Sequence, residues 1–375
     1  MLPPSRRTSR LISIFTLFAV FLCACSAREQ PAEVIQAHVE FNRIDTGHLE
    51  ARKHHTQVWM DGDLIVWGGY SMGGDTLPDG AIFSEQKGEW KSVSKSPISS
   101  RSHQASVIVD DHLFIWGGFS TEGGDGQPST GALYSPKEDS WVEIEKAPEG
   151  RAAAQAEYVD GLVVISGGLT PTRDLLVFSV LDDSWRRVPF SDDDSKYHVL
   201  GADSFENRVV ALASDSRGFH LIDYRAGEDR ASISPLSDIE NSTAAGISFS
   251  GKGDLYVISM GSMSSRLHHI TSSGRSELLF EDPTKTFRPN HLTAMHPFNR
   301  GSMEALGDRT LVSSGTEGVW LWDVENGHIT DIEPEQNKSF CGPLSVQEGA
   351  SMIGWIGANE CGLAGASVDL GDHIH

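Results

Sequence analysis

The chain has 375 residues, of which 39% are hydrophobic and 22% are charged, a composition typical of a folded globular protein. The formal net charge at pH 7 is −22, which argues against nucleic-acid binding because a surface of that sign repels the phosphate backbone. The 38 glycines indicate many tight turns.

Residues 1–24 have the pattern of a signal peptide. The basic start consists of Arg6, Arg7 and Arg10, and an uncharged run of 12 residues extends from Leu11 to Leu22. A run of this length is too short to span a bilayer but suits the apolar core of a signal peptide.

The stretch LCACS (22–26) ends this segment. It resembles the bacterial lipobox, in which a small residue stands directly before a cysteine and a leucine stands three places before it. The resemblance implies cleavage before Cys25 and lipidation of Cys25, and Ser26 resembles the residue that directs sorting to the outer membrane. We therefore expect a protein anchored at the cell envelope by its N-terminal lipid, with residues 25–37 as the tether.

An apolar run followed by two glycines occurs three times, as LIVWGGY (64–70), LFIWGGF (113–119) and VVISGGL (163–169). The glycine pairs are 49 and then 50 residues apart. The register extends upstream, where the units share an Arg and an Asp, and the first two also share a His: Arg52, Arg101, Arg151; Asp61, Asp110, Asp160; His54, His103. Short runs rich in β-branched and aromatic residues are typical of buried strands, and the glycines end them where a Cβ would clash.

The same three units continue in register after the glycines. GAIFS (80–84), GALYS (131–135) and LLVFS (175–179) are each followed by a tryptophan: Trp90, Trp141 and Trp185. A glycine pair, an aromatic residue in the next strand and a later Trp, in this order, resemble the kelch motif. The resemblance implies an all-β fold, a β-propeller in which each unit is a four-stranded blade, with the Trp filling the space between blades.

The later units lose these marks but keep the spacing. Their buried strands are RVVALAS (208–214), DLYVISM (254–260), RTLVSSG (309–315) and SMIGWIG (351–357). With the first three, they predict about seven blades, and six is the alternative; the period near 50 residues is that of kelch units.

The two ends of the ring complement each other. The last unit stops after its third strand, GASVDL (365–370), and an orphan strand, HVEFNRID (38–45), precedes the first unit. We expect the N-terminal strand to complete the last blade, which closes the ring and removes an open sheet edge. A single propeller would then span 38–371, with 372–375 as a C-terminal tail.

Two cysteines are left once the signal peptide and the lipidated Cys25 are set aside. Cys341 and Cys361 both fall in the seventh unit. Two cysteines in an exported chain favour one disulfide, and the alternative is two buried free thiols.

The repeated arginines are the candidate ligand-binding residues. Arg52, Arg101 and Arg151 stand just before the first strand of their units, near long polar loops that follow the glycines. A basic cluster there would bind an anion such as a carboxylate sugar. The alternative is that the repeat itself needs these arginines, which then bond to neighbouring backbone or carboxylate groups.

The sequence predicts no metal site and no cofactor. His54 and His103 recur in register, which is typical of strand-end structure. His268 and His269 are neighbours on a predicted strand, so they point to opposite faces. The acidic stretch SDDDS (191–195) lacks the glycine and the terminal Glu of a calcium loop, so we interpret it as a solvated turn.

The function that the repeat favours is a binding or scaffold module for protein or glycan partners, not an enzyme. Fold alone does not fix function. The runner-up is a sugar-modifying enzyme similar to the sialic-acid mutarotases, for which Arg300, Glu304 and His291 are the candidate catalytic residues. A copper oxidase similar to galactose oxidase would need a Cys cross-linked to a Tyr, and the two cysteines at hand are predicted to pair with each other. Any chemistry should lie in what does not repeat: the long loops after Gly69 and Gly118, and the diverged units beyond residue 190.

Overall fold

The structure is a computed structural model. It describes residues 33–39, 42–45, 47–121, 126–192, 194–236, 239, 245–260, 265–282, 303–315, 318–334, 345–346, 351–355 and 365–370. The described residues form strands, turns and connecting segments, and none of them belongs to a helix long and apolar enough to span a membrane.

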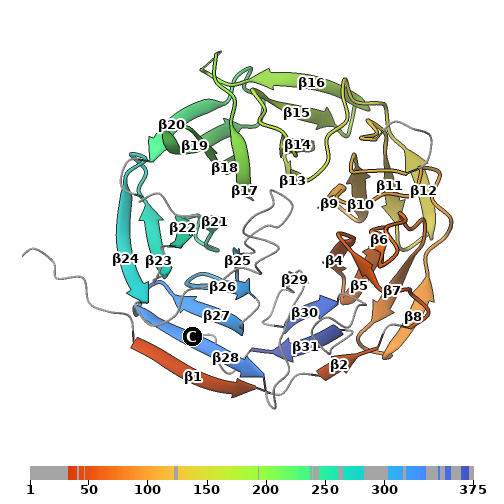
Figure 1. The fold of residues 1–375 in the computed structure, drawn as a ribbon, viewed down its shortest axis with the longest axis horizontal. Coiled ribbons are helices and arrows are strands. Elements are labelled where there is room, and N and C mark those ends of the chain that lie inside the picture. The colour runs from red at the N-terminus through yellow and green to blue at the C-terminus, as the bar shows by residue number, and fades with distance from the viewer. Residues whose placement is uncertain are drawn as a thin grey trace, which may run out of the picture.

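The strands form sheets arranged around a central axis (Figure 1). The first sheet consists of β4 (Thr56–Met60), β5 (Asp63–Trp67), β7 (Gly80–Ser84) and β8 (Glu89–Ser92). The second consists of β9 (Ala105–Val109), β10 (His112–Trp116), β11 (Gly131–Ser135) and β12 (Ser140–Glu143). The third consists of β13 (Ala154–Val159), β14 (Leu162–Gly167), β15 (Asp174–Ser179) and β16 (Ser184–Pro189).

The diverged half of the chain follows the same antiparallel order. The fourth sheet consists of β17 (His198–Phe205), β18 (Arg208–Asp215), β19 (Gly218–Arg225) and β20 (Ser232–Leu236). The fifth consists of β21 (Ala245–Phe249), β22 (Leu255–Met260), β23 (Ser265–Ile270) and β24 (Ser276–Asp282). In each of these five sheets the first strand lies nearest the axis and the last strand lies at the rim (Figure 1).

Two sheets contain strands from both ends of the chain. The five-stranded sheet has β25 (Met303–Ala305), β26 (Thr310–Gly315), β27 (Gly318–Asp323) and β28 (His328–Pro334), and β1 (Glu33–Val39) pairs with β28 in parallel at its rim. The closing sheet has β29 (Ser345–Val346), β30 (Ser351–Trp355) and β31 (Gly365–Asp369), with β2 (Asn42–Ile44) antiparallel to β31. A short ribbon of β3 (Arg52–Lys53) and β6 (Tyr70–Ser71) lies beside the first sheet.

The all-β propeller is therefore confirmed. Among the described residues six sheets have four strands each. Apart from the ribbon of β3 and β6, the remaining sheet has five strands because β1 is added to its four, so seven sheets lie around the axis. The expectation that an N-terminal strand completes the last blade is confirmed by β2, whereas residues 33–37, predicted as tether, belong to β1.

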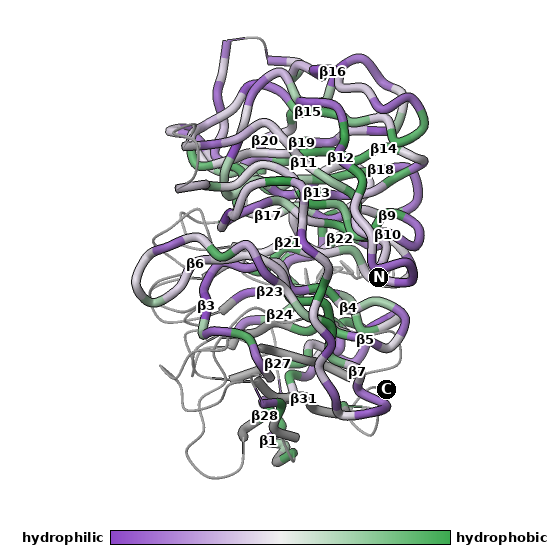
Figure 2. Tube along the Cα trace, turned by 90° about the vertical axis from the view of Figure 1, so that its right-hand side faces the viewer, coloured by the Kyte–Doolittle hydropathy of each residue, from purple (hydrophilic) through white to green (hydrophobic). Residues whose placement is uncertain are grey.

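The core is divided among the interfaces between neighbouring sheets. One buried cluster joins the second and third sheets through Phe114, Trp116, Ile165 and Phe178. Among the described residues, comparable clusters join the first and second, the third and fourth, the fourth and fifth, and the fifth and five-stranded sheets. Hydrophobic segments accordingly lie along the strands in Figure 2, and hydrophilic segments are frequent in the loops at the margins. Each sheet thus needs its neighbour to bury its apolar faces, which is the physical reason for a repeat.

The predicted role of the tryptophans is confirmed in the first three units. The rings of Trp67 and Trp141, from adjacent sheets, have centroids 5.6 Å apart, and those of Trp116 and Trp185 are 5.3 Å apart. The indole Nε1 of Trp141 donates to the Ser94 carbonyl at 2.9 Å, back into the preceding unit. Trp90 and Trp185 donate in the same way to the carbonyls of Asp45 and Glu145, so the repeated Trp fills the inter-sheet space and also makes a hydrogen bond across it.

Candidate functional site

The ring has two faces that the strand directions define. The second strand of each of the first three units ends at its glycine pair, and we call this end of the ring the Gly-Gly face. The turns that join first to second strands, such as Asp61–Gly62 and Asp160–Gly161, lie at the opposite end because the strands are antiparallel. The turn between β18 and β19 lies on the Gly-Gly face by the same reasoning.

The three repeated arginines are buried at this end of the ring. Arg52 and Arg101 are 0% exposed and Arg151 is 5% exposed. Nη1 of each donates to the carbonyl of the first glycine in its own pair, at 3.1 Å for Gly68 and 3.1 Å for Gly117. Arg52 also binds the Asp79 carboxylate at 3.0 Å, and burial, which outweighs this carboxylate, lowers the pKa of Arg52.

The glycine pairs connect one unit to the next. Gly68 and Gly69 have φ values of 69° and 91°, in the left-handed region that favours glycine. The Gly69 amide donates to the Arg101 carbonyl at 2.8 Å, and a Cβ on Gly68 would lie 2.8 Å from that same oxygen. Each arginine therefore holds its own glycine turn by its side chain, and the carbonyls of Arg101 and Arg151 also accept from the glycine pair of the preceding unit.

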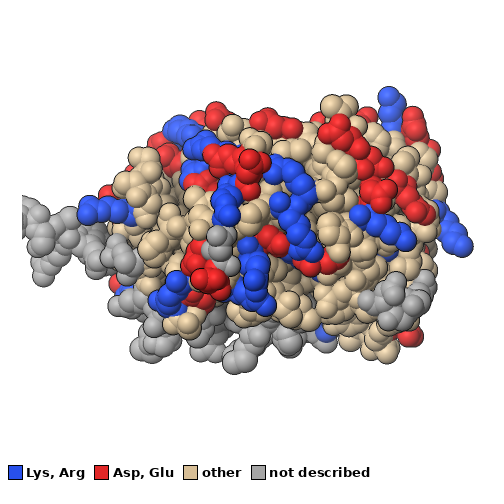
Figure 3. Space-filling model, turned by 90° about the horizontal axis from the view of Figure 1, so that it is seen from above, with Lys and Arg blue, Asp and Glu red and all other residues tan. Residues whose placement is uncertain are grey.

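This geometry matches the alternative interpretation of the arginines, in which the repeat itself needs them for bonds to neighbouring groups. Their guanidinium donors bind backbone carbonyls, hydroxyls and carboxylates of the same repeat. Figure 3 shows the basic and acidic side chains of the rim interspersed, without one large basic patch on that side.

The repeated histidines also contribute to the connection between units. The rings of His54 and His103 are stacked with centroids 3.8 Å apart. The His103 amide donates to the His54 carbonyl at 2.9 Å, and the Ala153 amide donates to the His103 carbonyl at 2.8 Å. All three residues have positive φ, 52°, 56° and 58°, so this backbone link does not depend on the imidazole.

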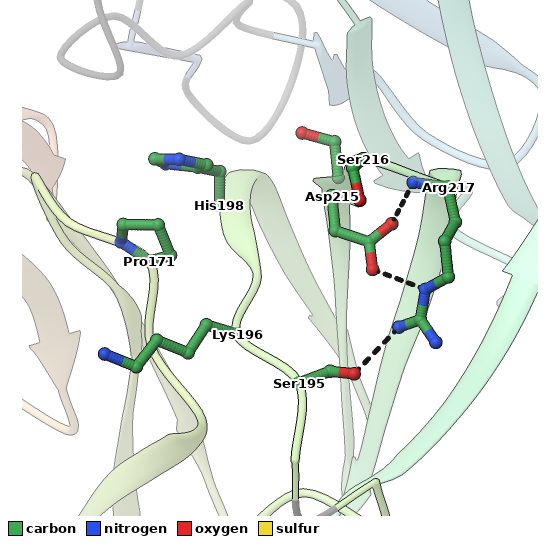
Figure 4. A pocket seen from close by; sticks show the side chains of 8 residues that line it. Pro171, Ser195, Lys196, His198, Asp215, Ser216 and Arg217 are labelled. Carbon is green, nitrogen blue, oxygen red and sulfur yellow. Dashed lines mark hydrogen bonds and ion pairs between the residues drawn. The ribbon is translucent and has the colours of Figure 1, made fainter.

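A cavity opens on the Gly-Gly face between the third and fourth sheets. Its volume is about 570 Å³. It is lined by Pro171, Ser195, Lys196, His198, Ser214, Asp215, Ser216 and Arg217. In Figure 4, Pro171 and Lys196 lie on one side, Asp215 and Arg217 lie on the other, and Ser195 lies between them.

Hydrogen bonds fix one wall of this cavity. Arg217 Nε donates to Asp215 Oδ2 at 2.6 Å, and Arg217 Nη2 donates to Ser195 Oγ at 3.0 Å and to Tyr197 OH at 2.7 Å. The guanidinium carbon also lies 5.8 Å from the centroid of the Tyr197 ring. The Arg217 side chain is 53% exposed but held on three sides, so its direction is set before any ligand arrives.

Asp215 joins this wall to the core of the fourth sheet. Its Oδ1 lies 2.9 Å from Nε2 of the buried His220. Burial opposes the charge of Asp215, but hydrogen bonds from the Arg217 amide, from His220 and from the Arg217 side chain outweigh it and lower the pKa of this carboxyl. Because the carboxylate only accepts hydrogen bonds, Nε2 of His220 carries the proton in this contact.

Sequence reasoning missed most of this cavity. The acidic stretch at 191–195 was interpreted as a solvated turn, yet Asp192 accepts from Tyr197 OH at 3.1 Å and Ser195 accepts from Arg217. The general expectation that chemistry lies beyond residue 190 does point to this region. No motif marks it, because its residues come from three separate segments.

Several predicted residues lie outside the described part of the chain. They are Cys25, His291, Arg300, Cys341 and Cys361, so lipidation, the disulfide and the alternative catalytic group stay predictions. Glu304 is described, in β25, where it pairs with Val312. Within the ranges described, no group of three His, Cys, Asp or Glu side chains is arranged to hold a metal ion.

Residues 39–206 match a family model described as the KLHDC2/KLHL20/DRC7 kelch-repeats domain. The match covers the first three sheets and β17, which is where the glycine pairs and the repeated Trp90, Trp141 and Trp185 occur. No curated protein matches the chain.

Proposed function

We propose that this kelch-repeat β-propeller is a binding module that holds a partner protein on its Gly-Gly face, and that a lipid on Cys25 anchors it in the bacterial cell envelope. Kelch propellers commonly bind proteins, and a ring of interlocked sheets offers a rigid platform with variable loops.

One observation carries the choice of face. The repeated polar residues there, Arg52, Arg101 and Arg151, are bonded within the ring, whereas the cavity on the same face is lined by side chains that do not repeat. Residues that a repeat does not need for its own structure are the ones available for recognition. The cavity, of about 570 Å³, also gives this face a concave surface.

The position of β1 is compatible with the anchor. β1 is the outermost strand of the five-stranded sheet, so the chain enters the ring at its rim. A tether attached there leaves the Gly-Gly face accessible.

Site-specific photo-cross-linking tests the binding face. A photoreactive amino acid is placed at Ser216, which is exposed beside the cavity, or at Leu181, which is 92% exposed in the turn at the opposite end. We expect a discrete protein adduct in intact cells from position 216 and none from position 181. Equal adducts at both positions, or none at position 216, would refute the proposal.

Metabolic labelling with a radioactive fatty acid tests the anchor. The wild-type chain should incorporate label and shift in size when signal peptidase II is inhibited, and Cys25→Ala should do neither. Label that persists in the Cys25→Ala variant would contradict lipidation at this residue.

A further inference from the structure

The cavity between the third and fourth sheets has the chemistry of a small-molecule site. Its volume of about 570 Å³ lies within the range of roughly 300–1,000 Å³ usual for ligand pockets. Its lining contains no aromatic ring other than the imidazole of His198 and no aliphatic side chain other than Pro171. A ligand that fits it is therefore polar.

The cavity contains one ammonium group and one imidazole that the described part of the fold does not use. Among the described residues, the Lys196 ammonium and the His198 imidazole make no hydrogen bond or ion pair. Arg217 is compensated by Asp215 and Asp192, at 2.6 Å and 3.3 Å. Lys196 is therefore the uncompensated charge, on a protein whose net charge is −22, and it favours an anionic group.

Hydroxyl groups line the rest of the cavity. Ser195 Oγ accepts from Arg217 Nη2, and its hydroxyl also hydrogen-bonds to the Asp192 carboxylate, so Ser195 belongs to the fixed wall of the cavity. Ser214 and Ser216 add two hydroxyls that can each donate and accept. Nη1 of Arg217 makes no hydrogen bond with the described residues, so it can donate in a direction that the bonds of Nε and Nη2 fix.

We propose that this cavity binds a hydroxylated acid of monosaccharide size, a sugar bearing a carboxylate or phosphate group. The oxyanion pairs with the Lys196 ammonium. The sugar hydroxyls exchange hydrogen bonds with Ser214 and Ser216 and accept from Arg217 Nη1. On this proposal the anion binds to Lys196, which does not repeat, and not to the repeated arginines that the sequence suggested.

This inference goes beyond the proposed function, which concerns a protein partner on the surrounding face. The two are tested separately, because direct titration of the purified chain needs no partner protein. A negative titration leaves the cross-linking result at position 216 standing, and the reverse also holds.

Isothermal titration of the purified full chain with three probes tests the proposal: glucuronate, glucose 6-phosphate and glucose. We expect at least one charged sugar to bind at least about tenfold more tightly than glucose, since a charge-assisted hydrogen bond contributes on that scale. Comparing glucuronate with glucose 6-phosphate distinguishes carboxylate from phosphate. Equal affinity for all three, or no binding of either charged sugar, would overturn it.

Variants of Lys196 make the test specific. Lys196→Gln should weaken binding of the charged sugar about tenfold, and Lys196→Arg should retain it. Lys87→Gln, in the exposed turn at the opposite end of the ring, is the matched control and should bind like wild type. Unchanged affinity in Lys196→Gln, with a wild-type melting temperature, would exclude this residue and with it the proposed site.

Discussion

Arg151 and Arg187 bind the same two carboxylates. Arg151 Nη2 contacts Glu149 Oε1 at 2.7 Å and also Asp174 Oδ1, while Arg187 contacts Glu149 Oε2 and Asp174 Oδ2, each at 2.8 Å. The four side chains close a ring of alternating charge in the third unit. Arg52 meets a single carboxylate, Asp79, at the equivalent place, and Arg101 meets the Thr130 hydroxyl at 3.1 Å.

This group of four charged side chains predicts a pH-dependent contribution to stability. The hydrogen bond from Arg187 is the main cause that lowers the pKa of Glu149, against the opposing effect of burial and with further help from Arg151. A carboxyl whose pKa is lowered by folding stabilises the fold above its unfolded pKa and loses that contribution as pH falls through its folded pKa. Glu149→Gln should therefore destabilise the protein at neutral pH and cease to do so in acid.

Glu149→Gln should lower the free energy of unfolding by about 1 kcal/mol or less at neutral pH, because Glu149 is 41% exposed and water screens its ion pairs. Urea unfolding at about pH 7 and about pH 3 measures it against the wild type. Glu143→Gln on the exposed strand β12 is the control. A difference that persists undiminished at the lower pH would contradict the assignment.

The glycine pairs predict a contrast between two alanine substitutions. Gly62 and Gly68 both have positive φ, 83° and 69°, but a Cβ on Gly62 would meet open space whereas one on Gly68 would lie 2.8 Å from the Arg101 carbonyl. Gly62→Ala should lower the free energy of unfolding by about 1 kcal/mol, from backbone strain alone. Gly68→Ala should lower it by about 3 kcal/mol or more, since overpacking adds to the same strain.

Chemical denaturation of both variants measures this contrast. If the two losses were equal, the contact between Gly68 and the next unit would have no energetic role.

The closure of the ring predicts a difference between alanine substitutions at two isoleucines. Ile44, in β2, is 3% exposed in the cluster that joins β2 to the first sheet, and Ile35, in β1, is 43% exposed. Ile44→Ala should lower the free energy of unfolding by about 2–4 kcal/mol, and Ile35→Ala by about 1 kcal/mol or less. Thermal unfolding compares them, and a larger effect at Ile35 would mean that β1, and not β2, provides the main closure.

Tyr256 predicts alkaline sensitivity of the fifth sheet. Burial, with Asp254 and Glu325 nearby, raises the pKa of Tyr256 to about 12. The unfolded phenol titrates at about pH 10, so its contribution to stability is complete below that pH and is lost as pH rises toward 12. Tyr256→Phe should therefore lose less stability than wild type between about pH 8 and about pH 11. Denaturant unfolding at these two pH values measures the difference, and parallel losses would refute it.

The first half of the fold could be predicted from the sequence because its marks are local. A glycine that must have positive φ, such as Gly68, and a tryptophan that fills the next interface, such as Trp141, constrain a single residue type at a fixed spacing. The partner of the last sheet could also be predicted, from a missing strand at one end and a spare one at the other. The parallel addition of β1 could not, because its residues carry no sign of which edge they join.

The candidate site was less accessible to prediction for a related reason. Arg101 repeats, which draws attention to it, but repetition reflects the needs of the ring. Lys196 and Arg217 lie on opposite sides of one cavity because the segment before β17 and the turn after β18 both line it, and neither segment has a motif. Their shared place in one cavity is a property of the three-dimensional packing, which spacing in one sequence does not encode.

The pairing of β2 with β31 also constrains the order of folding. Asn42 lies opposite Ser367, so nearly the whole chain separates the two strands of one hairpin-like contact. On the ribosome, β2 is made long before its partner β31. The sheets between them can form as neighbours one after another, while β2 waits unpaired with an open edge. We therefore expect ring closure to be a late step of folding, and the pairing of β2 with β31 ends the exposure of that edge.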